Sequence, residues 1–506
     1  MLLADVAAAS RAVAATRSRL AKRALLIDVL RSAEPADVPV VARYLGGELR
    51  QRRTGLGWRS VAELPPPADQ PTLTVLDVDA AFSRIAALSG AGSGSARAAA
   101  AAELFAAATA DEQRLLRGLV TGELRQGALD ALLLEAVADA AGVPADAVRR
   151  AAMLAGETEA VAVAALTSSD PAAALAAFRL TVGRPVRPML AQSAPDVDAA
   201  FASLGEGPAF VDAKLDGIRI QVHRRGDAIS VYTRSLDDIT ARVPEIVERV
   251  RAMPGGDLVL DGEALVVGAD GRPVPFQDTA ARTASHDADV AGAATLTPFF
   301  FDCLHSGGVD LLDEPLTTRL TALDEVATGA VVGRVATAHA AEARAYFADA
   351  VAAGQEGVVI KAARAPYEAG RRGAGWIKVK PRHTLDLVVL AVERGSGRRR
   401  GLLSNIHLGA RDPAGGFVML GKTFKGMTDD MLAWQTERFT ELQVDDDGWV
   451  VTVRPEQVVE IAFDGVQRST RYPGGLALRF ARVLRYRDDK TADEADSIET
   501  VRALAV

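Results

Sequence analysis

The spacing of apolar residues divides this chain into a helical first part and a longer, strand-rich second part. Up to about residue 180, stretches such as 12–30 and 133–141 carry apolar residues three and four positions apart, which is typical of amphipathic helices. Turn signals separate them, namely three prolines at 65–67 and a Gly/Ser-rich run at 90–95. The pattern predicts an all-α domain over residues 1–180.

Beyond Leu180 the pattern changes to short β-branched runs that alternate with helical stretches. The segment T-V-G-R-P-V-R-P-M-L-A (181–191) holds two prolines and is expected to be an extended linker between domains. Strands are predicted at 208–215, 218–223, 228–233, 257–267, 297–304, 356–361 and 376–380. We therefore expect an α+β domain over 181–383.

The last part, 384–506, has a third pattern. Five short strands lie within 385–463, bounded by Gly, Pro and Asp turns, and one helix is predicted at 429–439. This arrangement favours a small β-barrel of the oligonucleotide-binding type. A length of 506 residues agrees with about three domains at ~150 residues each.

Charge is distributed unevenly along the chain. The net charge is −8, yet residues 361–400 contain eleven Lys or Arg against three Asp or Glu, a local balance of +8. Such a patch indicates phosphate binding, although a solvated basic face without a partner has the same composition. Cys303 is the only cysteine, which excludes an internal disulfide and a cysteine-based zinc module. With neither a signal peptide nor a membrane-spanning run in the sequence, we expect a cytoplasmic protein.

The stretch F-V-D-A-K-L-D-G-I-R (210–219) places a lysine in a strand-like run. Strand alternation predicts Asp212, Lys214 and Asp216 on one face. Gly217 is expected to turn the backbone so that Arg219 opens a returning strand. A lysine is a nucleophile only when deprotonated, which requires a dry site or a cationic neighbour. The alternative is an ordinary charged surface hairpin.

Polar residues recur at the later strands and their ends. They are Arg234 after one strand, Asp261 and Glu263 on one strand face, Phe301 beside Asp302, Glu356 and Lys361 around an apolar strand, and Trp376, Lys378 and Lys380 on one face. Together they predict a pocket with carboxylates for a metal, cations for phosphates and an aromatic surface for a base.

Two further patterns admit more than one interpretation. G-E-L-R-Q occurs at 47–51 and at 122–126, and a glycine before a new helix could bind a phosphate, or both copies could be helix caps. Residues 416–423 (G-F-V-M-L-G-K-T) satisfy the P-loop pattern by letter. Their Phe, Val, Met and Leu predict a strand instead of a loop, so we reject a P-loop and keep Lys422 and Lys425 as candidate polyanion contacts.

K-L-D-G-I-R resembles the nucleotidyl-lysine motif of ATP-dependent DNA ligases, within the superfamily that includes capping enzymes. The five later stretches resemble the other motifs of that family in the same order, and 478–490 resembles its final motif. The resemblance is greatest to the three-domain ligases of actinobacteria. It implies an all-α DNA-binding domain, an α+β nucleotidyltransferase (ATP-grasp-like adenylation) domain and a C-terminal OB-fold β-barrel.

The resemblance also implies roles for matching residues. Lys214 would attack the α-phosphate of ATP and keep AMP as a phosphoramidate, before AMP passes to the 5′-phosphate of a nick and the 3′-hydroxyl displaces it. Nucleotide-binding positions would be Asp212, Arg219, Arg234, Glu263, Phe301, Arg372, Lys378 and Lys380. Glu263 and Glu356, with Asp216 as a further candidate, would hold Mg²⁺, and Arg482, Arg487, Asp488 and Lys490 would close over the pyrophosphate.

The sequence thus predicts a DNA ligase that uses ATP and Mg²⁺ on nicked double-stranded DNA, monomeric and nucleoid-associated, with no membrane contact. RNA ligases and capping-type guanylyltransferases share the lysine motif and remain alternatives, as does a non-catalytic DNA-binding protein. An NAD-dependent ligase would need a four-cysteine zinc module, which a single cysteine excludes.

Overall fold

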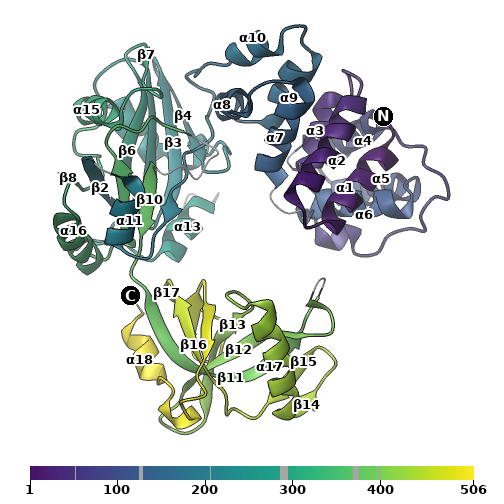
Figure 1. The fold of residues 1–506 in the computed structure, drawn as a ribbon. Helices are drawn as coiled ribbons and strands as arrows, with labels where there is room; N and C mark the ends of the chain where they lie inside the picture. The colour runs from purple at the N-terminus through teal and green to yellow at the C-terminus, as the bar shows by residue number, and fades with distance from the viewer. Residues whose placement is uncertain are drawn as a thin grey trace.

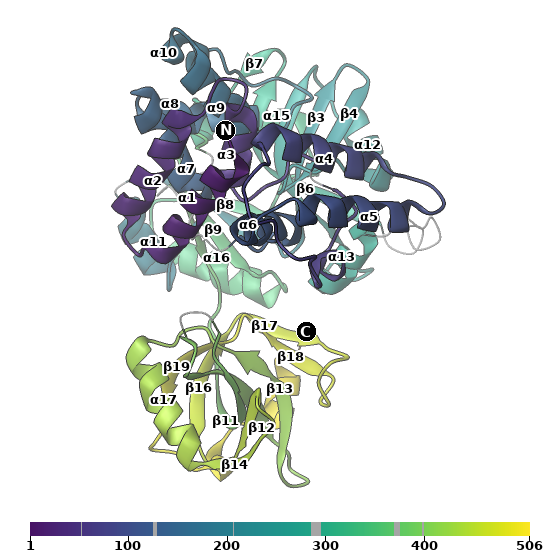
Figure 2. The ribbon, with the colours of Figure 1, turned by 90° about the vertical axis from the view of Figure 1, so that its right-hand side faces the viewer.

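The computed structural model describes residues 1–51, 53–124, 129–205, 207–284, 295–368, 375–396 and 399–505. They form three bodies: a helical N-terminal body, a central body of strands and helices, and a C-terminal β-rich body (Figure 1). Turning the molecule by 90° shows the helical body in front of the central one, with the C-terminal body below both (Figure 2). The predicted multidomain class, all-α, then α+β, then β-rich, is confirmed.

The helical body is built around a continuous apolar core that includes Val41, Phe82, Phe105 and Leu116. Three of its described helices, α2, α4 and α10, begin at a side-chain cap; Thr74, for example, accepts a hydrogen bond from the backbone of Asp77 at 3.1 Å at the start of α4. The elements are α1 (Leu3–Ala15), α2 (Arg19–Ser32), α3 (Val38–Leu45), η1 (Trp58–Val61), α4 (Val75–Ala87), α5 (Ser93–Ala106), α6 (Ala110–Thr121), α7 (Leu129–Ala141), α8 (Ala145–Ala155), α9 (Thr158–Thr167) and α10 (Pro171–Ala176).

The central body contains two five-stranded sheets with helices packed outside them. One sheet has the order β1-β10-β9-β2-β8 and the other β4-β3-β5-β6-β7. Their strands are β1 (Gln192–Ser193), β2 (Ala209–Lys214), β3 (Ile218–Arg225), β4 (Ala228–Thr233), β5 (Leu258–Val266), β6 (Leu296–Ser306), β7 (Val309–Asp310), β8 (Arg334–Thr337), β9 (Gly357–Ala362) and β10 (Trp376–Val379). The helices are α11 (Val197–Leu204), η2 (Thr240–Arg242), α12 (Pro244–Arg251), α13 (Phe276–Ala284), α15 (Leu316–Val326) and α16 (Ala340–Ala352).

The predicted hairpin at Gly217 is wrong. β2 pairs with β8 and β9, whereas β3 pairs with β4 and β5, so the chain passes from one sheet to the other between Lys214 and Ile218. Asp216 therefore lies outside the strand that carries Asp212 and Lys214. The error arose because a short loop between two strands has the same local sequence whether it joins neighbours or crosses between sheets.

The C-terminal body is a bent antiparallel sheet in which the long β11 pairs with β12 on one edge and with β15 and β16 on the other. Its elements are β11 (His383–Arg394), β12 (Leu403–Arg411), β13 (Phe417–Thr423), α17 (Asp429–Glu441), β14 (Gln443–Asp446), β15 (Val450–Val453), β16 (Val458–Phe463), β17 (Gly465–Arg468), β18 (Leu476–Arg479), β19 (Arg482–Tyr486), η4 (Ala492–Glu494) and α18 (Ile498–Ala503). All five predicted strands and the helix are present.

Residues 181–184 form a turn, closed by the Arg184 amide donating to the Thr181 carbonyl at 2.9 Å, and residues 185–191, which follow it, have no regular secondary structure. The prediction of an extended linker therefore fails for 181–184, and the segment is bound tightly to the central body. The side chain of Gln221 on β3 bonds both backbone groups of Val186, at 2.8 and 3.1 Å, and His223 accepts from the Gly183 amide at 3.0 Å. An apolar cluster joins Met153 and Leu154 of α8 to Val186 and Met189. Among the described residues, no helix has the length and apolar character needed to cross a membrane.

Candidate functional site

The predicted site residues lie on the facing surfaces of the two central sheets. In the first sheet, strand pairing aligns β2, β9 and β10 in rows: Phe210 with Lys361 and Trp376, then Asp212 with Val359 and Lys378, then Lys214 with Gly357. Paired residues of antiparallel strands share a face, and residues two apart along a strand share it too. The alternating pattern W-x-K-x-K therefore sets Trp376 and Lys378 on the same face of the sheet as Asp212 and Lys214, with β9 between the two strands.

Lys214 is the last residue of β2, and its side chain is 22% exposed. Its ammonium forms an ion pair with Glu356, whose backbone amide donates to the Lys214 carbonyl at 2.9 Å. The same carboxylate pairs with Lys380, which also contacts Asp464 of the C-terminal body at 3.2 Å. Burial lowers the pKa of Lys380, but the Glu356 and Asp464 carboxylates raise it by more. Glu356 is thus the centre of a charge cluster, in which it pairs with both Lys214 and Lys380.

Two glycines allow the backbone to approach closely around this lysine. A Cβ on Gly217 would lie 2.4 Å from the carbonyl oxygen of Ala264 in β5. A Cβ on Gly357, which has a φ of +139°, would lie 2.2 Å from the carbonyl oxygen of Val379. Close packing, rather than a hairpin turn, therefore explains the glycine in K-L-D-G, and the same holds for E-G-V-V-I-K.

The second sheet contributes Arg219 from β3 and two acids from β5. Arg219 bonds Asp261 through two nitrogens, at 2.9 and 2.6 Å, and Asp261 is fully buried. Glu263 is paired across the strands with Arg219. Burial raises the pKa of Glu263 to about 7, although the charges of Lys214 and Arg219 act in the opposite direction. The pair Arg219–Asp261 is fixed, whereas Glu263 makes no ion pair within the described chain.

Aromatic rings form the inner wall of the site. Phe301 falls at a β-bulge of β6, because Asp261 pairs with Asp302 while Gly262 pairs with Phe300. Its ring meets Trp376 edge to face at 5.8 Å. The Lys361 ammonium lies 4.6 and 4.3 Å from the centres of these two rings.

Lys361 also neutralises the buried Asp212. The ammonium lies 2.6 Å from the carboxylate and donates to the Phe301 carbonyl at 3.0 Å, and both charged side chains are almost wholly inaccessible. Burial raises the pKa of Asp212, and Lys361 opposes that shift. An acid held in this way next to two rings can accept a hydrogen bond from a planar polar group.

The C-terminal body reaches the site through its β17–β18 hairpin. Arg479 binds Asp216 at 2.6 Å, and its guanidinium carbon lies 5.6 Å from the centre of the Phe276 ring. Arg482 contacts Asp464 at 3.5 Å, which links it to the Lys380 and Glu356 cluster. The Arg479–Asp216 contact joins residues 263 positions apart, so it has no local signature in the sequence.

The other residues of the final motif face their own domain. Arg487 and Lys490 bind Asp386 of β11, at 3.0 and 2.6 Å, and Asp488 accepts from Gln457 at 3.0 Å. In this arrangement of the bodies, these three residues contact the C-terminal body and not Lys214. Arg482, by contrast, is connected through Asp464 to the charge cluster around Glu356.

The remaining predicted residues are placed as follows. Arg234 is exposed in the turn after β4 and makes no contact with the cluster in the part of the chain that is described. Arg372 lies outside the described residues. Residues 417–423 of the rejected P-loop form strand β13, and Lys422 pairs with Glu393, so the rejection is confirmed.

The repeated G-E-L-R-Q favours the capping interpretation in its described part. Gly47 and Gly122 have φ of +79° and +66°, and the following amides, of Glu48 and Glu123, bond carbonyls of α3 and α6 at 3.0 and 2.9 Å. No helix follows Gly47 directly, and the second copy lies partly outside the described residues.

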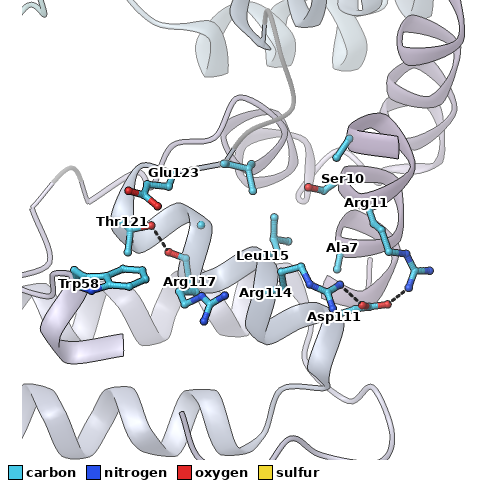
Figure 3. A pocket seen from close by; sticks show the side chains of 13 residues that line it. Ala7, Ser10, Arg11, Trp58, Asp111, Arg114, Leu115, Arg117, Thr121 and Glu123 are labelled. Atoms are coloured by element: carbon cyan, nitrogen blue, oxygen red, sulfur yellow. Dashed lines mark hydrogen bonds and ion pairs between the residues drawn. The ribbon is translucent and has the colours of Figure 1, made fainter. Parts of the chain in front are cut away.

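The second copy borders a hollow of about 320 Å³ between α1, α6 and η1 (Figure 3). Asp111 lies there between Arg11 and Arg114, and the exposed Trp58 stands at the opposite end. This hollow belongs to the helical body and is built from none of the residues around Lys214.

The sequence alone does not assign the roles of four residues of the site. It places Lys361 at a strand end and Asp261 on a strand face with Glu263, without predicting their partners. Tyr367, whose hydroxyl binds Asp261 at 2.7 Å, and Arg479 were not singled out. Of these four residues, only Tyr367 has a local signal. It is a tyrosine that follows an apolar strand, and the hydroxyl of a buried tyrosine needs a hydrogen-bond partner.

Comparisons with known proteins cover all three bodies. The family described as ATP dependent DNA ligase domain matches residues 188–380, its C terminal region matches 399–490, and DNA ligase N terminus matches 59–138. A relative named Probable DNA ligase from Beutenbergia cavernae is 73% identical over 100% of both chains. One of the same name from Nocardioides sp. is 62% identical over 99% of both. The solved structure Pmar-Lig_Pre, 19% identical, covers 96% of this chain and 99% of its own with a TM-score of 0.63, which supports the fold.

Proposed function

This chain belongs to the ATP-dependent DNA ligases, and we propose that it seals nicks through AMP carried on Lys214. The observation that carries the proposal is the position of Lys214, partly exposed at the end of β2, between sheets that carry the cations and rings a nucleotide needs. The comparisons do not favour an RNA ligase, a capping guanylyltransferase or a non-catalytic protein.

In this proposal, different pocket residues contact different parts of the nucleotide. Phe301 and Trp376 offer ring surfaces to the adenine, and Asp212, paired with Lys361, offers an acceptor to its amino group. Arg219, Lys378 and Lys380 supply positive charge for phosphate oxygens. Phosphoryl transfer depends on positioning and charge neutralisation more than on acid–base groups, which agrees with the lack of a histidine among the described residues around Lys214.

Lys214 must lose its proton before it attacks phosphorus. In the described structure its amine is engaged in an ion pair with Glu356, so this contact must give way before the amine reaches phosphorus. Attack forms the N–P bond as the bond to pyrophosphate breaks, and the amine proton leaves to solvent or to a neighbouring carboxylate. AMP then moves to the 5′-phosphate of the nick, and the 3′-hydroxyl displaces it.

The donor set fits Mg²⁺. Glu356 is a carboxylate already shared by two cations, and Glu263 is a desolvated acid without an ion-pair partner in the described chain, which is the kind of group that a cation stabilises. Magnesium in such sites takes one or two carboxylates and completes its shell with phosphate oxygens and water. When bound, the ion would neutralise phosphate charge, and Glu356 and Glu263 would hold it.

Nicked duplex DNA is the substrate that the family implies. We assign much of the grip on the duplex to the helical body, and we place the basic stretch 361–400 beside the phosphates. Action as a monomer in the cytoplasm, at the nucleoid, completes the proposal. Arg234 and Arg372 remain proposed contacts of the nucleotide or of the 5′-phosphate.

The test is labelling with α-labelled ATP. In Lys214→Arg the charge stays but a guanidinium cannot attack phosphorus, so we expect no protein-bound label and no joining of unadenylated nicks. Lys422→Arg is the matched control, because Lys422 belongs to β13 of the C-terminal body and should leave labelling intact. Label retained by Lys214→Arg would refute the assignment of the nucleophile, and label lost by a folded Lys422→Arg would revive the P-loop.

A further inference from the structure

A chain of hydrogen bonds runs from the segment that carries the helical body into the nucleotide pocket. The Met189 amide donates to the Tyr367 hydroxyl oxygen at 3.0 Å. The Tyr367 hydroxyl donates to Asp261 at 2.7 Å, and Asp261 holds Arg219 through two bonds. The chain therefore starts on segment 181–191 and ends at a cation in the site.

Burial fixes the direction of this chain. Tyr367 is 1% exposed and Asp261 is fully buried, so water does not compete for either group. The Met189 amide occupies one lone pair of the hydroxyl oxygen, which leaves its single proton for Asp261. Burial and the Asp261 charge both raise the pKa of Tyr367 above its ordinary value, so the hydroxyl keeps that proton.

The last link determines how Arg219 is oriented. Asp261 uses two of the five N–H groups of the guanidinium, and the others have no protein partner within the described residues. Arg219 is 16% exposed, with its guanidinium carbon 5.1 Å from the centre of the Phe301 ring. The plane of the guanidinium thus depends on the carboxylate, and the carboxylate depends on the Tyr367 proton.

We propose that Tyr367 is a positioning residue for ligation, holding Asp261 and through it Arg219, and that it links the nucleotide pocket to the seating of residues 181–191. This inference rests on the proposed function of Lys214 and Arg219. It adds a residue that touches neither the nucleotide nor the reacting atoms.

The other end of the chain connects to the helical body. Two residues before Met189, the Arg187 amide donates to the Met153 carbonyl of α8 at 2.9 Å, and the Arg187 guanidinium binds Asp130 at 2.7 Å. Met153 and Tyr367 belong to one apolar cluster. A shift of the helical body would therefore move the backbone that supports the Tyr367 hydroxyl.

Tyr367→Phe tests the proposal against a matched control, Tyr232→Phe. The Tyr232 hydroxyl also binds segment 181–191, at the Gly183 carbonyl (2.7 Å), and Tyr232 is also buried, yet it does not contact Asp261. We expect Tyr367→Phe to slow single-turnover chemistry about tenfold, in the same step that Arg219→Lys slows most. Tyr232→Phe should stay within about twofold of wild type, because its lost bond lies outside the relay.

The double variant Arg219→Lys/Tyr367→Phe supplies a readout that a structural role would not move. If Tyr367 acts through Arg219, the double variant is no slower than Arg219→Lys alone. Should Tyr367→Phe melt well below wild type, Asp261→Asn, which keeps the buried volume, is expected to slow the same step. Equal rates for the two tyrosine variants, or fully additive losses, would overturn the proposal. Failure of wild-type protein to form the AMP adduct would instead refute the proposed function.

Discussion

Replacing Arg479 by alanine tests how the C-terminal body takes part in the reaction. Arg479 binds Asp216 of the lysine motif at 2.6 and 3.5 Å, and the two side chains are 23% and 30% exposed. Fully exposed ion pairs contribute up to ~1 kcal/mol, and hydrogen bonds to charged groups ~1.5–3 kcal/mol. This half-buried bridge should therefore stabilise docking by about 1 kcal/mol, a factor of about five.

The loss should appear only in steps that use this docked arrangement. Because Arg487, Asp488 and Lys490 bind their own domain here, we expect this arrangement to serve the DNA steps and adenylation to use another orientation of the same body. We expect Arg479→Ala to slow sealing of a nick that already carries AMP about fivefold, in a single-turnover assay. Its rate of self-adenylation should stay within about twofold of wild type.

Arg468→Ala is the matched control. Arg468 makes the neighbouring bridge, to Asp278 at 2.6 Å, but the two side chains are 69% and 50% exposed, so its loss should change sealing less than twofold. Equal losses in adenylation and sealing for Arg479→Ala would refute the reasoning, because Arg479 would then act as a general scaffold contact.

Three further outcomes follow from the same geometry. Asp488→Ala/Lys490→Ala should impair adenylation far more than sealing of a pre-adenylated nick, the reverse of the effect expected for Arg479→Ala. Equal losses in the two single-turnover assays would contradict the expectation that the C-terminal body takes different orientations in the two steps. A chain that starts near Thr181 keeps both central sheets, so it should still adenylate itself. It should seal nicks poorly, and increasingly so with added salt. A salt titration that superimposes on the curve of the full-length protein would argue against DNA binding by residues 1–180. Burial raises the pKa of Glu263 to about 7, so the ionised form gains population as pH rises through 7. The rate of adenylation should therefore rise between about pH 6 and 8, and Glu263→Gln should flatten this pH profile. A profile that Glu263→Gln leaves unchanged would show that Glu263 is not the titrating group.

Glu263 also has a consequence for stability, with a definite sign. Its pKa in the folded protein lies above its ordinary value of 4.5, so the folded state binds more protons than the unfolded state between those values. Its contribution to the free energy of unfolding is therefore most favourable below about pH 4.5 and is lost as pH rises through about 7.

Local patterns predicted the elements of this protein well, because alternation and helical spacing are properties of neighbouring residues. The same alternation predicted that Trp376 and Lys378 share a face, and strand pairing through β9 then placed them on the same face as Asp212 and Lys214. It could not predict that β2 and β3 belong to different sheets, since a crossing loop and a hairpin have similar sequences.

Contacts between residues far apart in the chain could not be predicted from the sequence, for a different reason. Arg479 meets Asp216 across 263 positions, and Tyr367 meets Asp261 across 106, so neither contact has a local signature. The position of Phe301 depends on a bulge, which appears only once the register of β5 and β6 is known. The residues that support the site were thus harder to predict than the residues that form it.

Peptide mass spectrometry after incubation with ATP and Mg²⁺ tests the central claim most directly. The account predicts one added AMP, on the peptide that contains Lys214, in wild-type protein and in Lys422→Arg, and none in Lys214→Arg. AMP found on another residue, or the same adduct in Lys214→Arg, would contradict it.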